Sequence, residues 1–138
     1  MESTFTRLLR SVSIFILGVV VGCLLIPTVS AQFRSVKTTN LLTTDLAGWC
    51  DGKEVTIELD EVSPGTSGKH YHPGDSFTYV IAGTETYQLE GQPVKIVKAG
   101  DVLHEEPMQV HTVENQSPVK LLVMRIVEKG KPATVRIP

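Results

Sequence analysis

The chain has 138 residues and a formal net charge of −2, which leaves room for one domain and lacks the basic surplus of a nucleic-acid-binding protein. Aromatic residues make up only 6% of the chain, which is too few for a platform that stacks bases. We therefore expect no nucleic-acid partner.

The N-terminal segment predicts export. Arg7 and Arg10 precede an uncharged run over residues 11–33, and small residues occupy positions 29–31. This order is typical of a signal peptide and predicts a leader over residues 1–31, removed from a periplasmic or extracellular protein. The alternative is an uncleaved membrane anchor helix, because the run is about long enough to span and roughly 20 residues suffice. A lipoprotein box at residues 20–23 is disfavoured, because the apolar run continues beyond its cysteine.

The remainder of the chain predicts an all-β domain. Residues 32–40 are polar and indicate a linker or an edge arm, and we place the domain over residues 41–138. Residues 55–59 alternate apolar and polar side chains, and residues 84–89 and 94–97 indicate a hairpin. No segment after the leader has the apolar period of a helix. Short strands with frequent turns predict a sandwich or a barrel.

Three histidines predict a metal site. His70 and His72 are two residues apart, so on an extended segment both imidazoles point to the same face. A third, His111, lies in another strand-like segment. Three neutral imidazoles without a thiolate suit Fe, Zn, Mn, Ni or Cu. We therefore expect one divalent metal ion with coordination positions left open for a small molecule.

The same histidines belong to two motifs that resemble those of the cupin superfamily. The first motif consists of a glycine, a His-x-His pair and a second glycine, matched here by Gly65, His70, His72 and Gly83. The second motif runs from a glycine to a histidine and an asparagine, matched by Gly100, His111 and Asn115. The resemblance extends over residues 41–138, and residues 127–132 are similar to the tail of small exported cupins called quercetin-dioxygenase-like.

The resemblance implies a fold and an assembly. Members of this family form a double-stranded β-helix, also called a jelly-roll barrel, and many of them pair as homodimers. A homodimer is therefore expected here, and residues 134–137 are a candidate strand for the pairing. The resemblance also implies a mononuclear metal oxygenase or isomerase that acts on a small organic molecule.

Two departures from the family motifs affect the predicted site. The metal-binding glutamate of the family falls on Ser76, and the neighbouring Asp75 would face the opposite side of a regular strand. We therefore expect three histidine ligands without a carboxylate. In the second motif, the usual proline and glycine fall on Glu106 and Met108, which changes the loop before His111.

Several further residues are candidates for contacts around the metal or the substrate. Ser76 is a candidate hydrogen-bond donor to a ligand, and Asp75, His104 and Glu106 are candidates to orient the histidines or to act as a base. The candidate cavity-lining residues are Phe77, Tyr79, Tyr87 and Met108. Because the glutamate position is altered, a non-catalytic metal-binding or small-molecule-binding module is the alternative to an enzyme.

Overall fold

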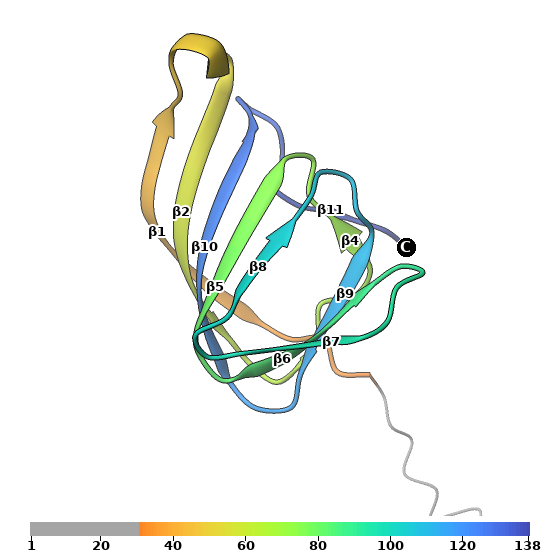
Figure 1. Ribbon diagram of the computed structural model, residues 1–138. Helices are drawn as coiled ribbons and strands as arrows, with labels where there is room; N and C mark the ends of the chain where they lie inside the picture. The colour runs from red at the N-terminus through yellow and green to blue at the C-terminus, as the bar shows by residue number, and fades with distance from the viewer. Residues whose placement is uncertain (1–30) are drawn as a thin grey trace, which may run out of the picture. The chain divides into compact units, whose positions relative to one another are not determined.

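Two β-sheets face each other in the computed structural model, which describes residues 31–138 (Figure 1). The strands are β1 (Val36–Asp45), β2 (Lys53–Val62), β3 (Gly65–Thr66), β4 (His70–Tyr71), β5 (Asp75–Ala82), β6 (Thr84–Leu89), β7 (Lys95–Lys98), β8 (Val102–Glu105), β9 (His111–Asn115), β10 (Val119–Glu128) and β11 (Val135–Arg136). One sheet has the order β1-β2-β10-β5-β8, and the other has the order β11-β4-β9-β6-β7, with β3 paired to β9. The prediction of an all-β jelly-roll barrel is confirmed.

The predicted leader lies outside the described residues, so its cleavage stays a prediction. Within residues 31–138, no helix has the length and apolar character needed to cross a membrane.

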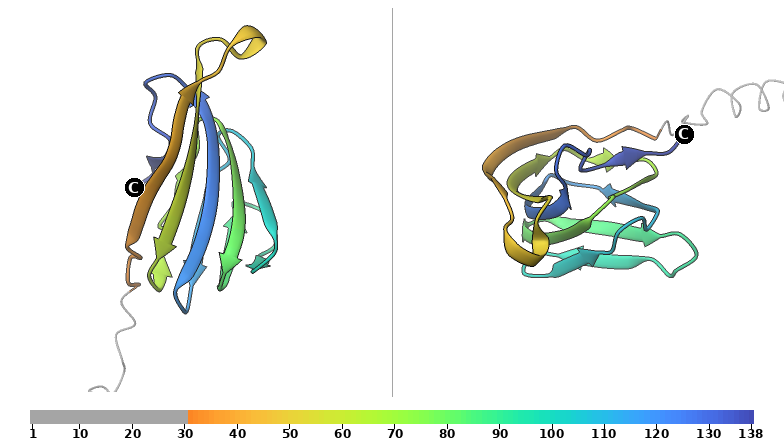
Figure 2. Two further views of the ribbon diagram at one scale, coloured as in Figure 1. Left: turned by 90° about the vertical axis from the view of Figure 1, so that its left-hand side faces the viewer. Right: turned by 90° about the horizontal axis from the view of Figure 1, so that it is seen from above.

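The N-terminal part of the described chain is a strand rather than a linker. The interpretation of residues 32–40 as a linker is wrong, because β1 starts at Val36 and pairs with β2 along its length. The alternative of an edge arm agrees with the position of β1 at the border of its sheet. The β1–β2 hairpin closes through a short 3-10 turn over Gly48–Cys50 and extends beyond the neighbouring strands (Figures 1 and 2).

Alternation along the strands separates the interior of the barrel from its surface. On β5, Ser76, Thr78 and Val80 are buried, while Phe77 and Tyr79 point outward. This pattern follows from the pleat, which turns successive side chains to opposite faces. The main apolar core consists of Val62, Val80, Tyr87, Val97, Leu103, Val113, Val119, Leu121 and Val123. The two sheets enclose this core and a polar interior beside it (Figure 2).

The register of the first sheet places polar residues at two levels of the interior. Ser76 lies opposite Glu105 on one side and Arg125 on the other. Four residues further along β10, Leu121 lies opposite Asp60. These levels are therefore roughly 13 Å apart along the strand, since each residue adds about 3.3 Å.

Two loop positions shape the entry into the strands that carry the histidines. A Cβ atom at Gly74 would lie 1.9 Å from the carbonyl oxygen of Ile126, so only glycine fits at this position, directly before β5. Met108 has φ of 67°, in the left-handed region that favours glycine. Its backbone N–H donates to the carbonyl of His72 at 2.8 Å, which ties the loop before His111 to the His-x-His segment.

The C-terminal strand closes the second sheet within the same chain. β11 pairs with β4, and Arg136 lies opposite His70. β11 forms one border of this sheet, so the expected role of residues 134–137 in pairing two chains stays a prediction.

Candidate metal centre

The three predicted histidines meet in the interior of the barrel. His70 and His72 come from β4 and the residue that follows it, and His111 opens β9 directly opposite His70. All three side chains are buried. Each offers a ring nitrogen within 4.8 Å of the corresponding nitrogens of the other two, a spacing that one ion can bridge after a small contraction. The structure therefore brings the three expected ligands together.

Backbone carbonyls fix the orientation of each imidazole. Nδ1 of His70 lies 3.0 Å from the carbonyl oxygen of Gly68, and Nδ1 of His111 lies 2.8 Å from that of Gln109. His72 makes the same contact with Ala133 at 2.8 Å. Because a carbonyl only accepts, each Nδ1 carries the proton and each Nε2 keeps a lone pair. Histidines that ligate metals are held in this way.

Glu105 supplies the carboxylate that the sequence analysis missed. Its Oε1 lies 3.0 Å from Nε2 of His111 and its Oε2 lies 3.5 Å from Nε2 of His72. Glu105 is 5% exposed and occupies β8 directly opposite Ser76 on β5. The expectation of a site without a carboxylate is therefore wrong: the carboxylate comes from the neighbouring strand instead of from position 76.

Nitrogen and oxygen acceptor atoms face one another in this site. Nε2 of His111 is buried and makes no hydrogen bond, although Oε1 of Glu105 is only 3.0 Å away. Two lone pairs at this distance repel each other unless a proton or a metal ion lies between them. The three imidazoles and Glu105 thus match a divalent ion in donor type and in charge.

The pKa values of these groups reflect their burial and their contacts with one another. Burial lowers the pKa of His70 to about 4 and also lowers the pKa of His72. Burial opposes protonation of His111 as well, but contact with Glu105 outweighs it and raises the pKa of His111 above 6.5. Burial alone would raise the pKa of Glu105, yet His111 and His72 hold it down at about 2. Glu105 therefore stays ionised beside the imidazoles.

A cavity of about 520 Å³ adjoins the histidines. Its charged and polar lining residues are Arg34, Thr38, Glu58, Asp60, Ser67, His70, His72, Thr78, Glu85, Glu105, Arg125, Thr134 and Arg136. Its apolar wall consists of Val36, Val62, Leu103, Val113, Leu121, Val123 and Ala133. The volume suits a small organic molecule next to the candidate metal position.

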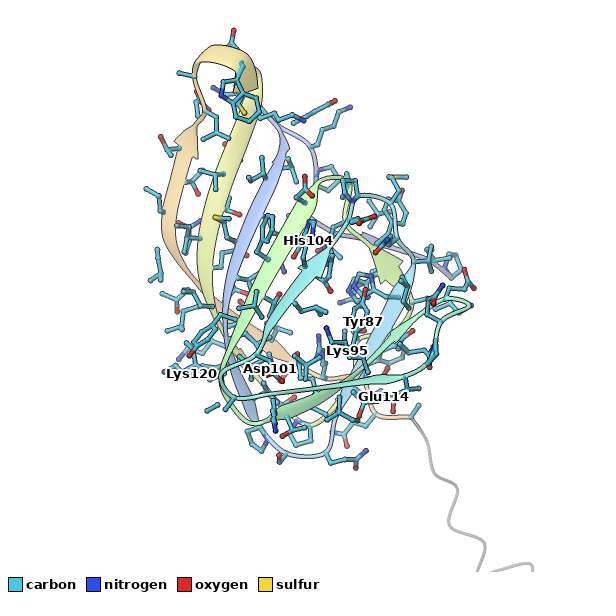
Figure 3. All side chains as sticks on the ribbon, viewed as in Figure 1. Tyr87, Lys95, Asp101, His104, Glu114 and Lys120 are labelled. Carbon is cyan, nitrogen blue, oxygen red and sulfur yellow. The ribbon has the colours of Figure 1, made fainter. Side chains whose placement is uncertain are left out.

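Ser76 and Tyr87 lie inside the barrel, as expected for candidates near the site. The hydroxyl of Ser76 is buried without a hydrogen-bond partner among the described residues. The ring of Tyr87, labelled in Figure 3, lies 5.1 Å from that of His111. Burial raises the pKa of Tyr87 to about 12, so its phenol stays protonated and packs beside the histidine.

The remaining candidates lie outside the cavity. His104, labelled in Figure 3, donates a hydrogen bond from Nε2 to the carboxylate of Asp75 at 2.9 Å and stacks on Phe77 with ring centroids 4.5 Å apart. This group lies on the outer face of β5 and β8, so its assignment to the metal site is wrong. The same alternation places Tyr79 outside, with 43% of its surface exposed.

The two candidates in the loop before His111 also point away from the site. Met108 is 58% exposed, and Glu106 is exposed and accepts a hydrogen bond from Gln109 at 3.0 Å. Neither side chain can line the cavity or orient a histidine.

The sequence did contain one signal for Glu105. It lies two residues after the apolar Leu103, which puts both side chains on the same face of a strand.

Comparisons with known proteins agree with this geometry. The family model described as "Cupin domain" matches residues 50–125. No curated protein matches the chain. Among solved structures, a cupin superfamily protein of Desulfitobacterium hafniense is 17% identical, with a TM-score of 0.57 over 72% of this chain and 84% of that chain.

Two other solved structures show the same fold. A cupin-like protein of Thermotoga maritima is 25% identical, with a TM-score of 0.50 over 78% of this chain and 81% of that one. DMSP lyase DddQ of Ruegeria pomeroyi is 17% identical, with a TM-score of 0.58 over 73% of this chain. The present chain covers 51% of that lyase, about half of its length. With the family match over more than half of its residues, this chain belongs to the cupin family.

Proposed function

We propose that this protein is a mononuclear metal enzyme that oxygenates or isomerises a small organic molecule. The metal ion is held by His70, His72, His111 and Glu105. The observation that carries the proposal is the convergence of three Nε2 lone pairs and one carboxylate in a buried site. Four ligands leave coordination positions open toward the cavity.

The residues of the chain have separate tasks in this proposal. A bound divalent ion supplies Lewis acidity and, where the metal is redox-active, oxygen chemistry. The carbonyls of Gly68, Ala133 and Gln109 hold the imidazoles in position, so little reorganisation is needed on binding. Glu105 reduces the charge of the site by one. The apolar wall of the cavity excludes water from the bound molecule.

Metal content and turnover test the proposal together. Purified protein should hold one divalent ion per chain, measured by elemental analysis, and His111→Ala should lose the ion while its circular-dichroism spectrum stays that of a β-protein. Oxygen uptake and product analysis with diketone and phenolic probes then test catalysis. Retention of metal by His111→Ala at wild-type affinity would contradict the proposed ligand set.

A non-catalytic module is the second candidate, and one observation favours it. The two carboxylates that the sequence offered as bases, Asp75 and Glu106, both lie outside the cavity. Stoichiometric metal with no conversion of any probe would support a protein that binds a metal or a small anion without turnover.

We also propose export, on the basis of the leader pattern in residues 1–31. Intact-mass analysis of protein from the cell envelope should give a chain that begins at Gln32. A mass that includes residues 1–31 would support the membrane anchor instead. In either case the barrel should be found outside the cytoplasm.

A homodimer is part of the proposal because the barrel has an unprotected border. All ten residues of β1 are exposed, and β1 forms one edge of its sheet. Exposed edge strands of this length are normally paired or covered. Analytical ultracentrifugation should give twice the mass of the chain, and a monomer at all concentrations would contradict this part of the proposal.

A further inference from the structure

Asp60 is a buried carboxylate that the metal site does not use. It is 6% exposed, lines the same cavity as the histidines, and accepts a hydrogen bond from the hydroxyl of Thr38 at 2.7 Å. Among the described residues it has no ion-pair partner. Its near neighbours across the strands include Leu121, and Val62 lies two residues further along β2. A carboxylate in such surroundings needs a donor or a cation, because one neutral hydroxyl only partly compensates for its burial.

Two of the arginines that line the same cavity are already paired with carboxylates. Arg34 contacts Glu85 at 2.6 Å, and Arg125 contacts Glu58 at 2.5 Å. These two pairs contribute no net charge to the cavity. Among residues 31–138, neither of these arginines pairs with Asp60, so the negative charge of Asp60 is left over at one end of the cavity.

The opposite end of the cavity has the opposite charge when a divalent ion is bound. Glu105 is the carboxylate beside the three neutral imidazoles, so a site holding the ion carries one positive charge. Arg136, which lies opposite His70 and donates to the carbonyl of Ser67 at 2.6 Å, adds a cation near that end. The cavity is therefore positive at the histidines and negative at Asp60.

The distance between these ends sets the length of a molecule that contacts both. Glu105 belongs to the level of Ser76 and Arg125, and Asp60 belongs to the level of Leu121. The backbone positions are roughly 13 Å apart along the strands, and β2 and β8 are also separated by three strand spacings of about 4.8 Å across the curved sheet. A molecule that contacts both ends therefore needs an extended chain, and the length that fits best is found by experiment.

We propose that the cavity selects a small zwitterion whose anionic group binds at the histidine end and whose ammonium-type cation binds Asp60. This inference rests on the proposed metal site, and it adds the substrate class. Complementary charges at both ends favour a zwitterion over a simple carboxylate of equal length, because the carboxylate would leave Asp60 buried without a cation.

Matched probes test this selection directly. Zn²⁺-loaded protein is titrated by calorimetry with 6-aminohexanoate and with hexanoate, and the pair is repeated with shorter and longer chains to match the span. In the wild type the amino acid of the best length should bind at least about tenfold more tightly than the matching alkanoate, since its ammonium group forms a charged hydrogen bond with Asp60. Equal binding of the two probes at every length would overturn the inference.

Two variants locate the preference in the structure. In Asp60→Asn, which keeps the shape of the side chain, the preference should fall to less than about twofold. In Glu61→Gln, which changes the next residue on β2 and removes an exposed contact with Lys37, the preference should remain. A preference that persists in Asp60→Asn would show that another group binds the cation.

The metal titration separates this inference from the proposed function. Asp60→Asn should bind Zn²⁺ with wild-type affinity, because Asp60 lies outside the ligand set. If the wild type itself fails to bind Zn²⁺, the proposed function is wrong, and metal-free protein is then titrated with hexylamine and hexan-1-ol. Tighter binding of the amine, lost in Asp60→Asn, would keep the role of Asp60, and equal binding would refute it.

Discussion

The substitution Glu105→Gln gives the sharpest test of the metal centre. It replaces the buried carboxylate with an amide of the same shape, so the barrel should fold normally. The amide nitrogen lies within reach of Nε2 of His111 or His72, to which the carboxylate oxygens approach at 3.0 and 3.5 Å. Because an amide N–H donates to this lone pair, the variant satisfies the site in the absence of metal. A metal ion must then displace a hydrogen bond and bind without the negative charge.

The size of the effect follows from the pKa of Glu105. Its surroundings lower this pKa from 4.5 to about 2, and one pKa unit corresponds to about 1.4 kcal/mol. Because burial acts in the opposite direction, the contacts with His111, His72 and Ser76 stabilise the ionised carboxylate by about 3 kcal/mol or more. A divalent ion carries more charge than a proton, so we expect at least a hundredfold loss of metal affinity in Glu105→Gln.

Competition with a chelator measures this loss. Zn²⁺ dissociation constants are compared for the wild type, Glu105→Gln and the neighbouring control Glu106→Gln, whose side chain is exposed. The control should stay within about threefold of the wild type. A dissociation constant for Glu105→Gln within threefold of the wild type would refute the assignment of Glu105 as a ligand.

Exchange of the two facing residues extends the test. Ser76 and Glu105 lie directly opposite each other on β5 and β8, so their Cβ atoms are about 5 Å apart. The double variant Ser76→Glu with Glu105→Ser moves the carboxylate to the position used by the family. It should recover most of the affinity that Glu105→Ser alone loses. No recovery would show that only β8 can present the carboxylate.

Three further predictions concern stability. Burial lowers the pKa of His70 to about 4 and that of His72 in the same direction, so the unfolded chain, with its usual value near 6.5, takes up these protons first. The unfolding free energy of the metal-free protein should therefore fall as the pH is lowered from about 6.5 to about 4, by up to about 3 kcal/mol for His70. The raised pKa of His111 acts in the opposite direction. Urea unfolding in the presence of a chelator measures the sum, and higher stability at pH 4.5 than at pH 7 would contradict the prediction that His70 and His72 outweigh His111. Met108→Gly should leave stability unchanged or raise it by up to about 1 kcal/mol. It removes left-handed strain of about 1–2 kcal/mol at φ of 67°, and this gain is partly offset by about 0.5–1 kcal/mol for the greater entropy of the unfolded chain. Met108→Val should be less stable than the wild type, and the reverse order in thermal unfolding would argue against this backbone conformation. Gly74→Ala should lower the unfolding free energy by about 3 kcal/mol or more and weaken metal binding, because its Cβ would overlap the carbonyl of Ile126. The control Gly91→Ala, with open space around it, should lower the unfolding free energy by about 1 kcal/mol. Equal losses of unfolding free energy in the two variants would contradict the tight packing at Gly74.

The sequence alone was sufficient for the fold class and for the three histidines. Alternation over residues 55–59 and frequent turns are local properties, so they predict strands without knowledge of the partners. His70 and His72 share a strand face for the same local reason, and His111 was recognised through a motif. These predictions needed no register between distant strands.

Tertiary structure decided the carboxylate and the lining of the cavity. Glu105 joins the histidines because β8 pairs with β5 in a register that places it opposite Ser76, and no local pattern encodes that register. Apolar character suggested that Phe77 and Tyr79 face inward, but this interior contains charges and a cavity, so β5 turns its small polar residues toward it and its aromatic residues outward. Asp60 likewise became visible as a functional candidate only when β2 and β10 placed it, without a cation, in the same cavity as the metal ligands. Sequence determined which residues lie on a common face of each strand, because that depends on neighbours along the chain, whereas pairing between strands decided which faces meet.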